Sequence, residues 1–190
     1  ILAGSRHKGI TLPQVETDLR AASRHAAGRF AAHGHQRVAI LRPTAAFAGD
    51  AESVAGFREG SRNAEVIEIS CQNHPEGVIR ALHQLLHMRP VPTGLYVLHP
   101  DHCVTALSFL LRHGIAVPSA MSIICRDDEP YIGLLTPQPA RYRRSAKAMA
   151  SKLAVLTLEV AKSNKRLERS LIIMPSSIPG ETLATAKPVR

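Results

Sequence analysis

The chain has 190 residues, of which 45% are hydrophobic and 21% are charged, and its formal net charge is +9. This length suffices for one large core or two small lobes, and no apolar run approaches the roughly 20 residues of a membrane-spanning helix. The scattered basic residues, the 4% aromatic content and the lack of tryptophan favour a generally basic surface over a nucleic-acid interface.

Strands and helices alternate along most of the chain. Four short apolar runs are expected to be buried strands, at residues 37–41, 66–70, 94–98 and 121–125. Helical periodicity predicts helices at residues 19–32, 51–62, 75–88 and 101–113. This alternation indicates βαβ units, so the predicted fold class is α/β, with a doubly wound parallel sheet.

The remaining segments fit this series less well. Residues 1–2 look like the tail of a strand, and residues 143–162 form one long helical pattern. A last strand is expected at residues 171–174, where it would extend the same parallel sheet.

The three cysteines form no Cys-x-x-Cys pair, and Cys71 and Cys125 end apolar runs. A free thiol in such a place behaves as a small buried hydrophobe. This usage favours a reducing, cytoplasmic setting.

Polar loops follow all four expected strands, and ligands of open α/β sheets bind outside the carboxyl ends of the strands. These loops begin at Arg42, Cys71, His99 and Arg126. Asp127 is therefore expected on the rim of a cleft, where its carboxylate would accept hydrogen bonds from a polyhydroxylated or amine-bearing small molecule. The alternative is a loop salt bridge, for instance of Asp128 with Arg126 or another nearby arginine.

Catalytic and metal-binding patterns are weak. The sequence lacks GxSxG, GxxxxGK, HExxH and a GxGxxG after a strand. His83 and His87 have helical spacing but no third ligand, so exposed helix residues are expected and no metal or cofactor is predicted. His99 with Asp101 as its orienter could act as a general base, but Asp101 is more simply the N-cap of the next helix. The prediction is therefore a protein that is not an enzyme.

Four segments of the chain carry a family resemblance. They are "LPQVETDLRAASRHAAGRFAAHGHQRVAIL" (12–41), "SVAGFREG" (53–60), "PTGLYVLHPDHCVTALSFLLRHGIAVPSAMSIICRDDE" (92–129) and "LTPQPARYRRSAKAMASKL" (135–153). In order, they resemble the effector-binding region of the LacI/GalR family of bacterial transcription regulators. The second is similar to that family's Arg-x-x-Gly-Phe helix, and the third to its run that ends in Gly-Tyr-Asp-Asp.

The resemblance implies a periplasmic-binding-protein-like fold of type I with two lobes. Residues 18–138 and 166–185 would form most of the C-terminal lobe, and residues 1–17 and 139–165 would be remnants of the N-terminal lobe. It further implies a helix-turn-helix DNA reader, which these 190 residues do not contain.

The function implied is the effector-binding and dimerisation domain of a cytoplasmic DNA-binding regulator. Its partners would be a small-molecule effector, such as a sugar or sugar-like compound, operator DNA, and a second copy of the chain. In the family the lobe self-associates through a helix like that at 101–113, which here carries Cys103, Leu107 and Leu110 as apolar contacts. The alternative is a periplasmic small-molecule binding protein of a transport system, which shares the lobed architecture. An α/β enzyme that uses His99 is a third hypothesis.

The resemblance also implies the ligand-binding residues, which would be Asp127, Ser53, Asn73 and Pro100. Asp127 keeps the residue type with which the family contacts its effectors. Ser53 stands where the family usually has arginine, Pro100 replaces an asparagine, and Cys125-Arg126 replaces Gly-Tyr. Because the missing arginine removes a bidentate donor, the sequence indicates an unusual effector, or none, instead of a plain sugar.

Overall fold

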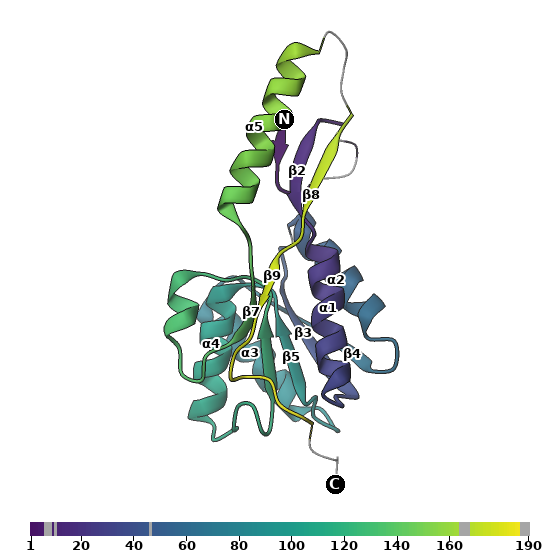
Figure 1. The fold of residues 1–190 in the computed structure, drawn as a ribbon. Helices are drawn as coiled ribbons and strands as arrows, with labels where there is room; N and C mark the ends of the chain where they lie inside the picture. Colours follow the sequence, from purple (N-terminus) through teal and green to yellow (C-terminus); the bar gives the residue numbers. More distant parts are fainter. Residues whose placement is uncertain (6–8, 10, 46, 164–167, 187–190) are drawn as a thin grey trace.

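The computed structural model describes residues 1–5, 9, 11–45, 47–163 and 168–186. Figure 1 shows a larger and a smaller part of the chain. The larger part is a central sheet with helices on both faces, and the smaller part is stacked on one end of the larger. Four helices belong to the larger part: α1 (Leu19–Ala32), α2 (Ala48–Gly60), α3 (Pro75–His87) and α4 (Pro100–Arg112). No described helix combines the length and apolar character needed to cross a membrane.

The larger sheet has six strands. They are β3 (Arg37–Pro43), β4 (Glu65–Cys71), β5 (Gly94–Val97), β6 (Ser122–Cys125), β7 (Ala140–Arg143) and β9 (Ser176–Ile178). Their spatial order is β4-β3-β5-β6-β7-β9. All neighbours pair in parallel except β7 and β9. The predicted doubly wound α/β fold is confirmed.

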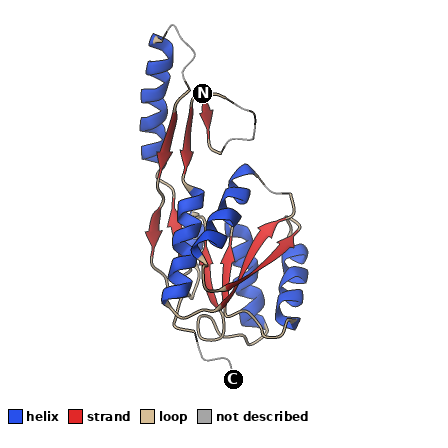
Figure 2. Ribbon diagram, turned by 90° about the vertical axis from the view of Figure 1, so that its right-hand side faces the viewer, coloured by secondary structure: helices blue, strands red, loops and turns tan. Residues whose placement is uncertain are grey.

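Strand alternation divides the core into two layers. Leu41 and Val97 pack in the cluster that includes α3 and α4, whereas Ile40 and Tyr96 pack in the cluster that includes α1 and α2. Successive side chains of a strand point to opposite faces, so runs that are apolar at every position need helices on both sides. Figure 2 shows these helices on either side of the strands.

The expected strand at 66–70 is the edge of the sheet, so the prediction that it is fully buried was wrong. Its element β4 pairs only with β3. Ser70 is exposed, and Val66 and Ile67 are half-buried. One face and one edge of the strand therefore retain contact with solvent.

The smaller part contains β1 (Leu2–Ala3), β2 (Gln14–Thr17), β8 (Ser170–Ile173) and α5 (Ala146–Lys162). The prediction that the last strand extends the larger sheet was wrong, because β8 pairs in parallel with β2. This position lets Ile173 join a small core with Val15 and Leu156 of α5. The chain then returns to the larger sheet through β9 (Figure 1).

Helix α4 presents its apolar stripe to the interior. Cys103 and Leu110 are fully buried and Leu107 is 3% exposed, all within the core cluster that includes α3. The prediction that these three residues make dimer contacts was therefore wrong. The helix begins after His99, with Pro100 at its first position, so the predicted N-cap role of Asp101 was also wrong.

Cys71 and Cys125 match their predicted role as buried hydrophobes. Both are buried and unpaired, as is Cys103. Burial raises the pKa of Cys71 to about 11, so this group is a neutral thiol at physiological pH.

Helices α1 and α2 approach each other most closely at Gly56. A Cβ on Gly56 would lie 2.0 Å from the backbone oxygen of Arg20, so Gly56→Ala must force the helices apart. We expect this variant to lower the free energy of unfolding by about 1–3 kcal/mol. Gly28 is the matched control, because nothing lies within 4 Å of a Cβ there. Gly28→Ala should stabilise α1 by about 0.5–1 kcal/mol. Urea denaturation of both variants checks this, and equal stabilities would contradict the close contact.

Candidate functional site

Arg126 lies directly after β6, and its backbone N–H donates to the carbonyl of Val97 at 2.8 Å. Strand alternation directs its side chain to the same face as Ile124, which packs in the cluster that includes α2. The side chain is only 6% exposed. The end of β6 thus delivers a guanidinium group to the buried side of α2.

The guanidinium of Arg126 joins two buried carboxylates. Its Nη1 donates to Asp50 Oδ1 at 2.6 Å and to Ser53 Oγ at 3.1 Å. Its Nε and Nη2 both donate to Asp127 Oδ2, at 3.2 and 2.8 Å. Asp50 and Ser53 are three residues apart on α2 and therefore share one face of that helix. The buried charges of Asp50 and Asp127 are paired within the protein.

Asp50 is the most tightly held acid of this group. Its Oδ2 accepts from the backbone N–H of Phe47 at 3.0 Å, and its Oδ1 lies 3.2 Å from His99 Nε2. Burial alone would raise the pKa of Asp50, but hydrogen bonds from His99 and Arg126 and the charge of Arg126 lower it to about 2. Its ionised form therefore stabilises the fold at neutral pH, and this contribution is lost as the pH falls from about 4 towards 2.

One oxygen of Asp127 has an ion pair but no hydrogen bond among the described residues. Its side chain is 6% exposed, and its Oδ1 is buried with no hydrogen-bond partner among the described residues. The Nε of the half-exposed Arg144 lies 3.5 Å away, as an ion pair. A buried acceptor without a donor is unfavourable by about 1–3 kcal/mol, and such groups in folded proteins call for an explanation. A ligand that donates a hydrogen bond to Oδ1 is an explanation that this site can accommodate.

A cavity of about 630 Å³ lies beside this carboxylate, at the carboxyl ends of β5 and β6. It is lined by Ser5, Leu19, Phe47, Ala48, Gly49, Asp50, His99, Pro100, Asp101, Arg126, Asp127, Glu129, Tyr131 and Arg144. The ring of Phe47 is 64% exposed, and the hydroxyl of Tyr131 donates to Asp101. A large hollow with aromatic side chains and convergent polar groups is the usual setting of a small-molecule site.

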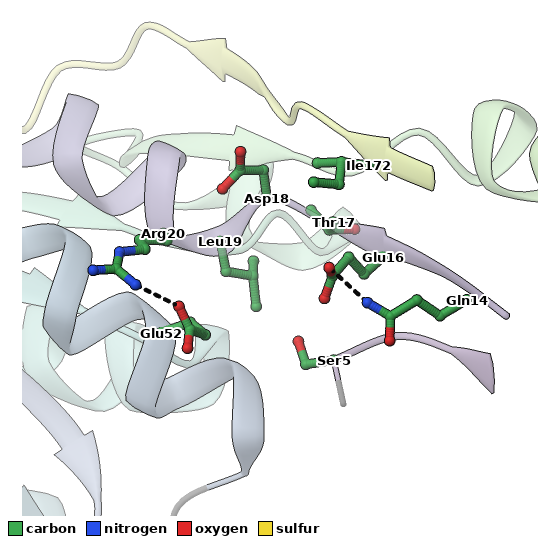
Figure 3. Close-up of a pocket in the computed structure, with 9 residues that line it drawn as sticks. All are labelled: Ser5, Gln14, Glu16, Thr17, Asp18, Leu19, Arg20, Glu52 and Ile172. Atoms are coloured by element: carbon green, nitrogen blue, oxygen red, sulfur yellow. Dashed lines mark hydrogen bonds and ion pairs between the residues drawn. The ribbon is translucent and has the colours of Figure 1, made fainter. Parts of the chain in front are cut away.

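A second hollow of about 350 Å³ shares Ser5 and Leu19 with the first. Figure 3 shows it between the smaller sheet and the start of α1 and α2. The Nε2 of Gln14 donates to Glu16 at 2.7 Å and to Ser170 at 2.9 Å. Its Oε1 is buried and lacks a hydrogen-bond partner among the described residues. The two hollows thus form one polar region at the junction of the two parts.

The predicted ligand-binding residues are only partly brought together. Asp127 and Pro100 line the cavity. Ser53 does not line the cavity, because it is fully buried and contacts Arg126. Asn73 is exposed in the loop between β4 and α3 and does not line the cavity.

Asp128 forms a loop salt bridge, the alternative to ligand binding that the sequence left open. Its two oxygens accept from Arg141 Nε at 2.5 Å and from Arg143 Nε at 2.7 Å. Both arginines belong to β7, so Asp128 fastens the loop after β6 to the neighbouring strand.

Sequence reasoning missed Asp50 and the central place of Arg126. Arg126 carried a usable signal, because it continues the period of two set by Ser122 and Ile124. Asp50 carried a weaker signal, as an acid near the start of a helix, where acids are stabilised. Nothing in the sequence indicates that they are close together, since 76 positions separate them.

The enzymatic hypothesis finds no support in the contacts of His99. This side chain contacts Asp50, whereas the proposed orienter Asp101 accepts from Tyr131. His83 and His87 are exposed on α3. The described residues contain no cluster of three side chains that could hold a metal ion.

Comparison with known proteins identifies the family. Residues 27–183 match the model of the periplasmic binding protein-like domain. The chain therefore belongs to this family, as the fold predicts. It is 22% identical over 178 residues to the probable HTH-type transcriptional repressor ExuR of Bacillus subtilis (strain 168). That alignment covers 88% of this chain and 54% of the repressor, so the chain spans about half the length of this curated relative.

Solved structures show the same fold. A LacI family transcriptional regulator from Enterococcus faecium with bound ribose superposes with a TM-score of 0.82 and 18% identity, over 96% of this chain and 69% of that one. The transcriptional regulator CelR in complex with cellobiose gives a TM-score of 0.81 and 19% identity, over 94% of this chain and 57% of that one.

Proposed function

We propose that this chain is the effector-binding and dimerisation domain of a bacterial DNA-binding transcription regulator of the LacI type. The observation that carries the proposal is the buried Oδ1 of Asp127, which accepts no hydrogen bond from the described residues and lies beside a cavity of about 630 Å³. This cavity lies where open α/β sheets bind ligands, outside the carboxyl ends of the strands. A small molecule that donates a hydrogen bond to this oxygen would be the effector.

The relatives favour a regulator over the transport alternative. The similar proteins compared above are named as a transcriptional repressor and as transcriptional regulators. A regulator of this kind works in the cytoplasm and would reach its operator through a helix-turn-helix outside these 190 residues. Ribose and cellobiose, bound in two structural relatives, support a sugar or sugar-like effector.

The two parts of the structure support the proposed division into lobes. Residues 1–17 and 139–165 would belong to one lobe and residues 18–138 and 166–185 to the other. The pairing of β8 with β2 supports moving residues 170–173 from the second lobe to the first, and the pairing of β7 with β6 supports moving residues 140–143 from the first lobe to the second. The effector would then bind at the junction, where the two hollows meet.

A test of the function combines ligand binding with DNA binding. The complete gene product would be screened for small molecules that raise its melting temperature, and its affinity for DNA from its own promoter would be measured by fluorescence anisotropy. We expect a ligand to change the DNA affinity by about 5- to 150-fold, the usual range of coupling between two sites. Ligand binding without any DNA binding would favour the transport alternative.

The proposed homodimer must use residues other than the buried stripe of α4. Leu111 is 45% exposed on that helix and is an available apolar contact. Sedimentation of the complete gene product should show a dimer, and Leu111→Glu should shift it towards monomer. A strictly monomeric wild type at high micromolar concentration would contradict the dimer.

A further inference from the structure

The unmet hydrogen-bonding groups in the two hollows are all of one kind. Among the described lining residues, the buried side-chain atoms without a hydrogen-bond partner are Gln14 Oε1 and Asp127 Oδ1. A carboxamide oxygen and a carboxylate oxygen can only accept. A ligand that satisfies them must therefore bring hydrogen-bond donors.

The buried guanidinium of Arg126, which an anionic ligand would need as a donor, is already committed within the protein. Arg126 has five N–H groups, and four of its hydrogen bonds go to Asp50, Ser53 and Asp127. It is held from several sides and cannot turn towards a ligand without leaving a buried carboxylate unpaired. The guanidinium thus positions Asp127, because it binds Oδ2 and leaves Oδ1 open.

The charges around the cavity also disfavour an anionic ligand. Its described lining includes four carboxylates, of Asp50, Asp101, Asp127 and Glu129, against two guanidinium groups, of Arg126 and Arg144. Unlike charges attract and like charges repel more strongly in a partly buried site than in water. The excess of carboxylates disfavours a ligand that carries its own carboxylate or phosphate.

We propose that this cavity selects ligands that are neutral or cationic at the group facing Asp127, such as the hydroxyl of a polyol or an ammonium group, and rejects carboxylates and phosphates. Arg126 is the positioning residue that sets this choice, by saturating Asp50 and one oxygen of Asp127. The proposal rests on the proposed ligand-binding function and specifies the chemistry of its ligand.

The test uses the complete gene product and a metabolite library that contains neutral polyols, amines, carboxylates and phosphates. Glucose, glucosamine, glucuronate and glucose 6-phosphate form an internal series with one ring and four different charges. Compounds that raise the melting temperature would be titrated by calorimetry into the wild type, Asp127→Asn, Arg144→Ala and the control Arg143→Ala. Asp127→Asn keeps the shape of the side chain and removes its charge.

We expect neutral or aminated compounds to bind, and we expect Asp127→Asn to weaken them by about ten-fold or more, because the amide oxygen would stay with Arg126 and an N–H donor would replace the charged acceptor Oδ1. Arg143→Ala should leave their affinity within about three-fold, because Arg143 pairs with Asp128 and does not line the cavity. Tight binding of a carboxylate or phosphate that depends on Arg144 and tolerates Asp127→Asn would overturn this inference and leave the ligand-binding function standing. If no compound of any class binds, the proposed function fails and the inference falls with it.

Discussion

Arg126→Ala should lower the free energy of unfolding by about 3–5 kcal/mol, the range for removing one partner of a buried ion pair. The variant would leave Asp50, which is 1% exposed, and Asp127, which is 5% exposed, without the cation between them. Asp50 would keep His99 Nε2 at 3.2 Å, and Asp127 would keep the half-exposed Arg144 at 3.5 Å. Urea denaturation followed by circular dichroism at neutral pH measures this loss.

The same variant should weaken the pH dependence of this site. In the wild type the pKa of Asp50 is held at about 2, below its ordinary value of 3.8, so stability is lost as the pH falls through this interval. Without the hydrogen bond and the charge of Arg126, the pKa of Asp50 should rise. Asp50 is then protonated at a higher pH in the folded variant than in the folded wild type, so the difference in stability should narrow as the pH falls below about 4.

Arg144→Ala is the matched control for both measurements. It removes an arginine that also contacts Asp127, but this side chain is 51% exposed. Exposed ion pairs contribute about 0–1 kcal/mol, so we expect little change in stability. If Arg126→Ala were as stable as this control, the buried guanidinium would not hold the two acids together.

Asp127→Ala should weaken the binding of the effector roughly ten- to more than a hundred-fold. A hydrogen bond from a ligand to a charged acceptor contributes about 1.5–3 kcal/mol, and Oδ1 is the open acceptor of this cavity. The fold should persist, because Arg126 retains Asp50 and Ser53 as partners. Calorimetric titration of the complete gene product with a ligand found by screening measures the change.

Asp128→Ala is the neighbouring control for that titration. The two oxygens of Asp128 accept hydrogen bonds from Arg141 and Arg143. Burial alone would raise the pKa of Asp128, but these hydrogen bonds lower it. Its loss should reduce stability while the affinity for ligand changes much less than in Asp127→Ala. Equal losses of affinity in the two variants would mean that the loop as a whole, instead of Asp127 Oδ1, determines binding.

Hydrophobic periodicity accounts for most of what the sequence predicted. Helix α1 has the predicted bounds, 19–32, and the other three helices of the larger part begin or end within three residues of theirs. The four apolar runs became β3, β4, β5 and β6. For the inner strands β3, β5 and β6 the reason is that a parallel sheet covered on both faces needs apolar side chains at nearly every position. Strand β7 was missed, since its alternation of Ala140, Arg141, Tyr142 and Arg143 is short and half charged.

Sheet membership was less predictable than strand position. The pattern of β8 indicates a strand, but its partner depends on which edge is free and where Ile173 can be buried. Tertiary contacts decide which of the two sheets β8 joins, and the local sequence does not show these contacts. The same holds for the site: Asp127 could be placed from its loop, whereas its pairing with Arg126 on one oxygen depends on α2.

The departures from the family pattern are linked in space. Ser53 stands where the resemblance places an arginine, and Arg126 stands where it places a tyrosine. In the structure the Nη1 of Arg126 lies 3.1 Å from Ser53 Oγ, so the small serine leaves room for a guanidinium that arrives from β6. In the sequence alone, the missing arginine at position 53 and the missing tyrosine at position 126 are unrelated. The structure shows that the guanidinium beside position 53 comes from Arg126.

A crystal structure of the complete gene product with its ligand is the decisive experiment on the role of Asp127. We expect the ligand to occupy the cavity beside Phe47 and Asp127, with a hydroxyl or ammonium group within about 3 Å of Asp127 Oδ1, the length of an ordinary hydrogen bond. Arg126 should still bridge Asp50 and Asp127 in that complex. A ligand bound elsewhere in the molecule, with Asp127 Oδ1 facing no part of it, would show that this carboxylate is not the effector's acceptor.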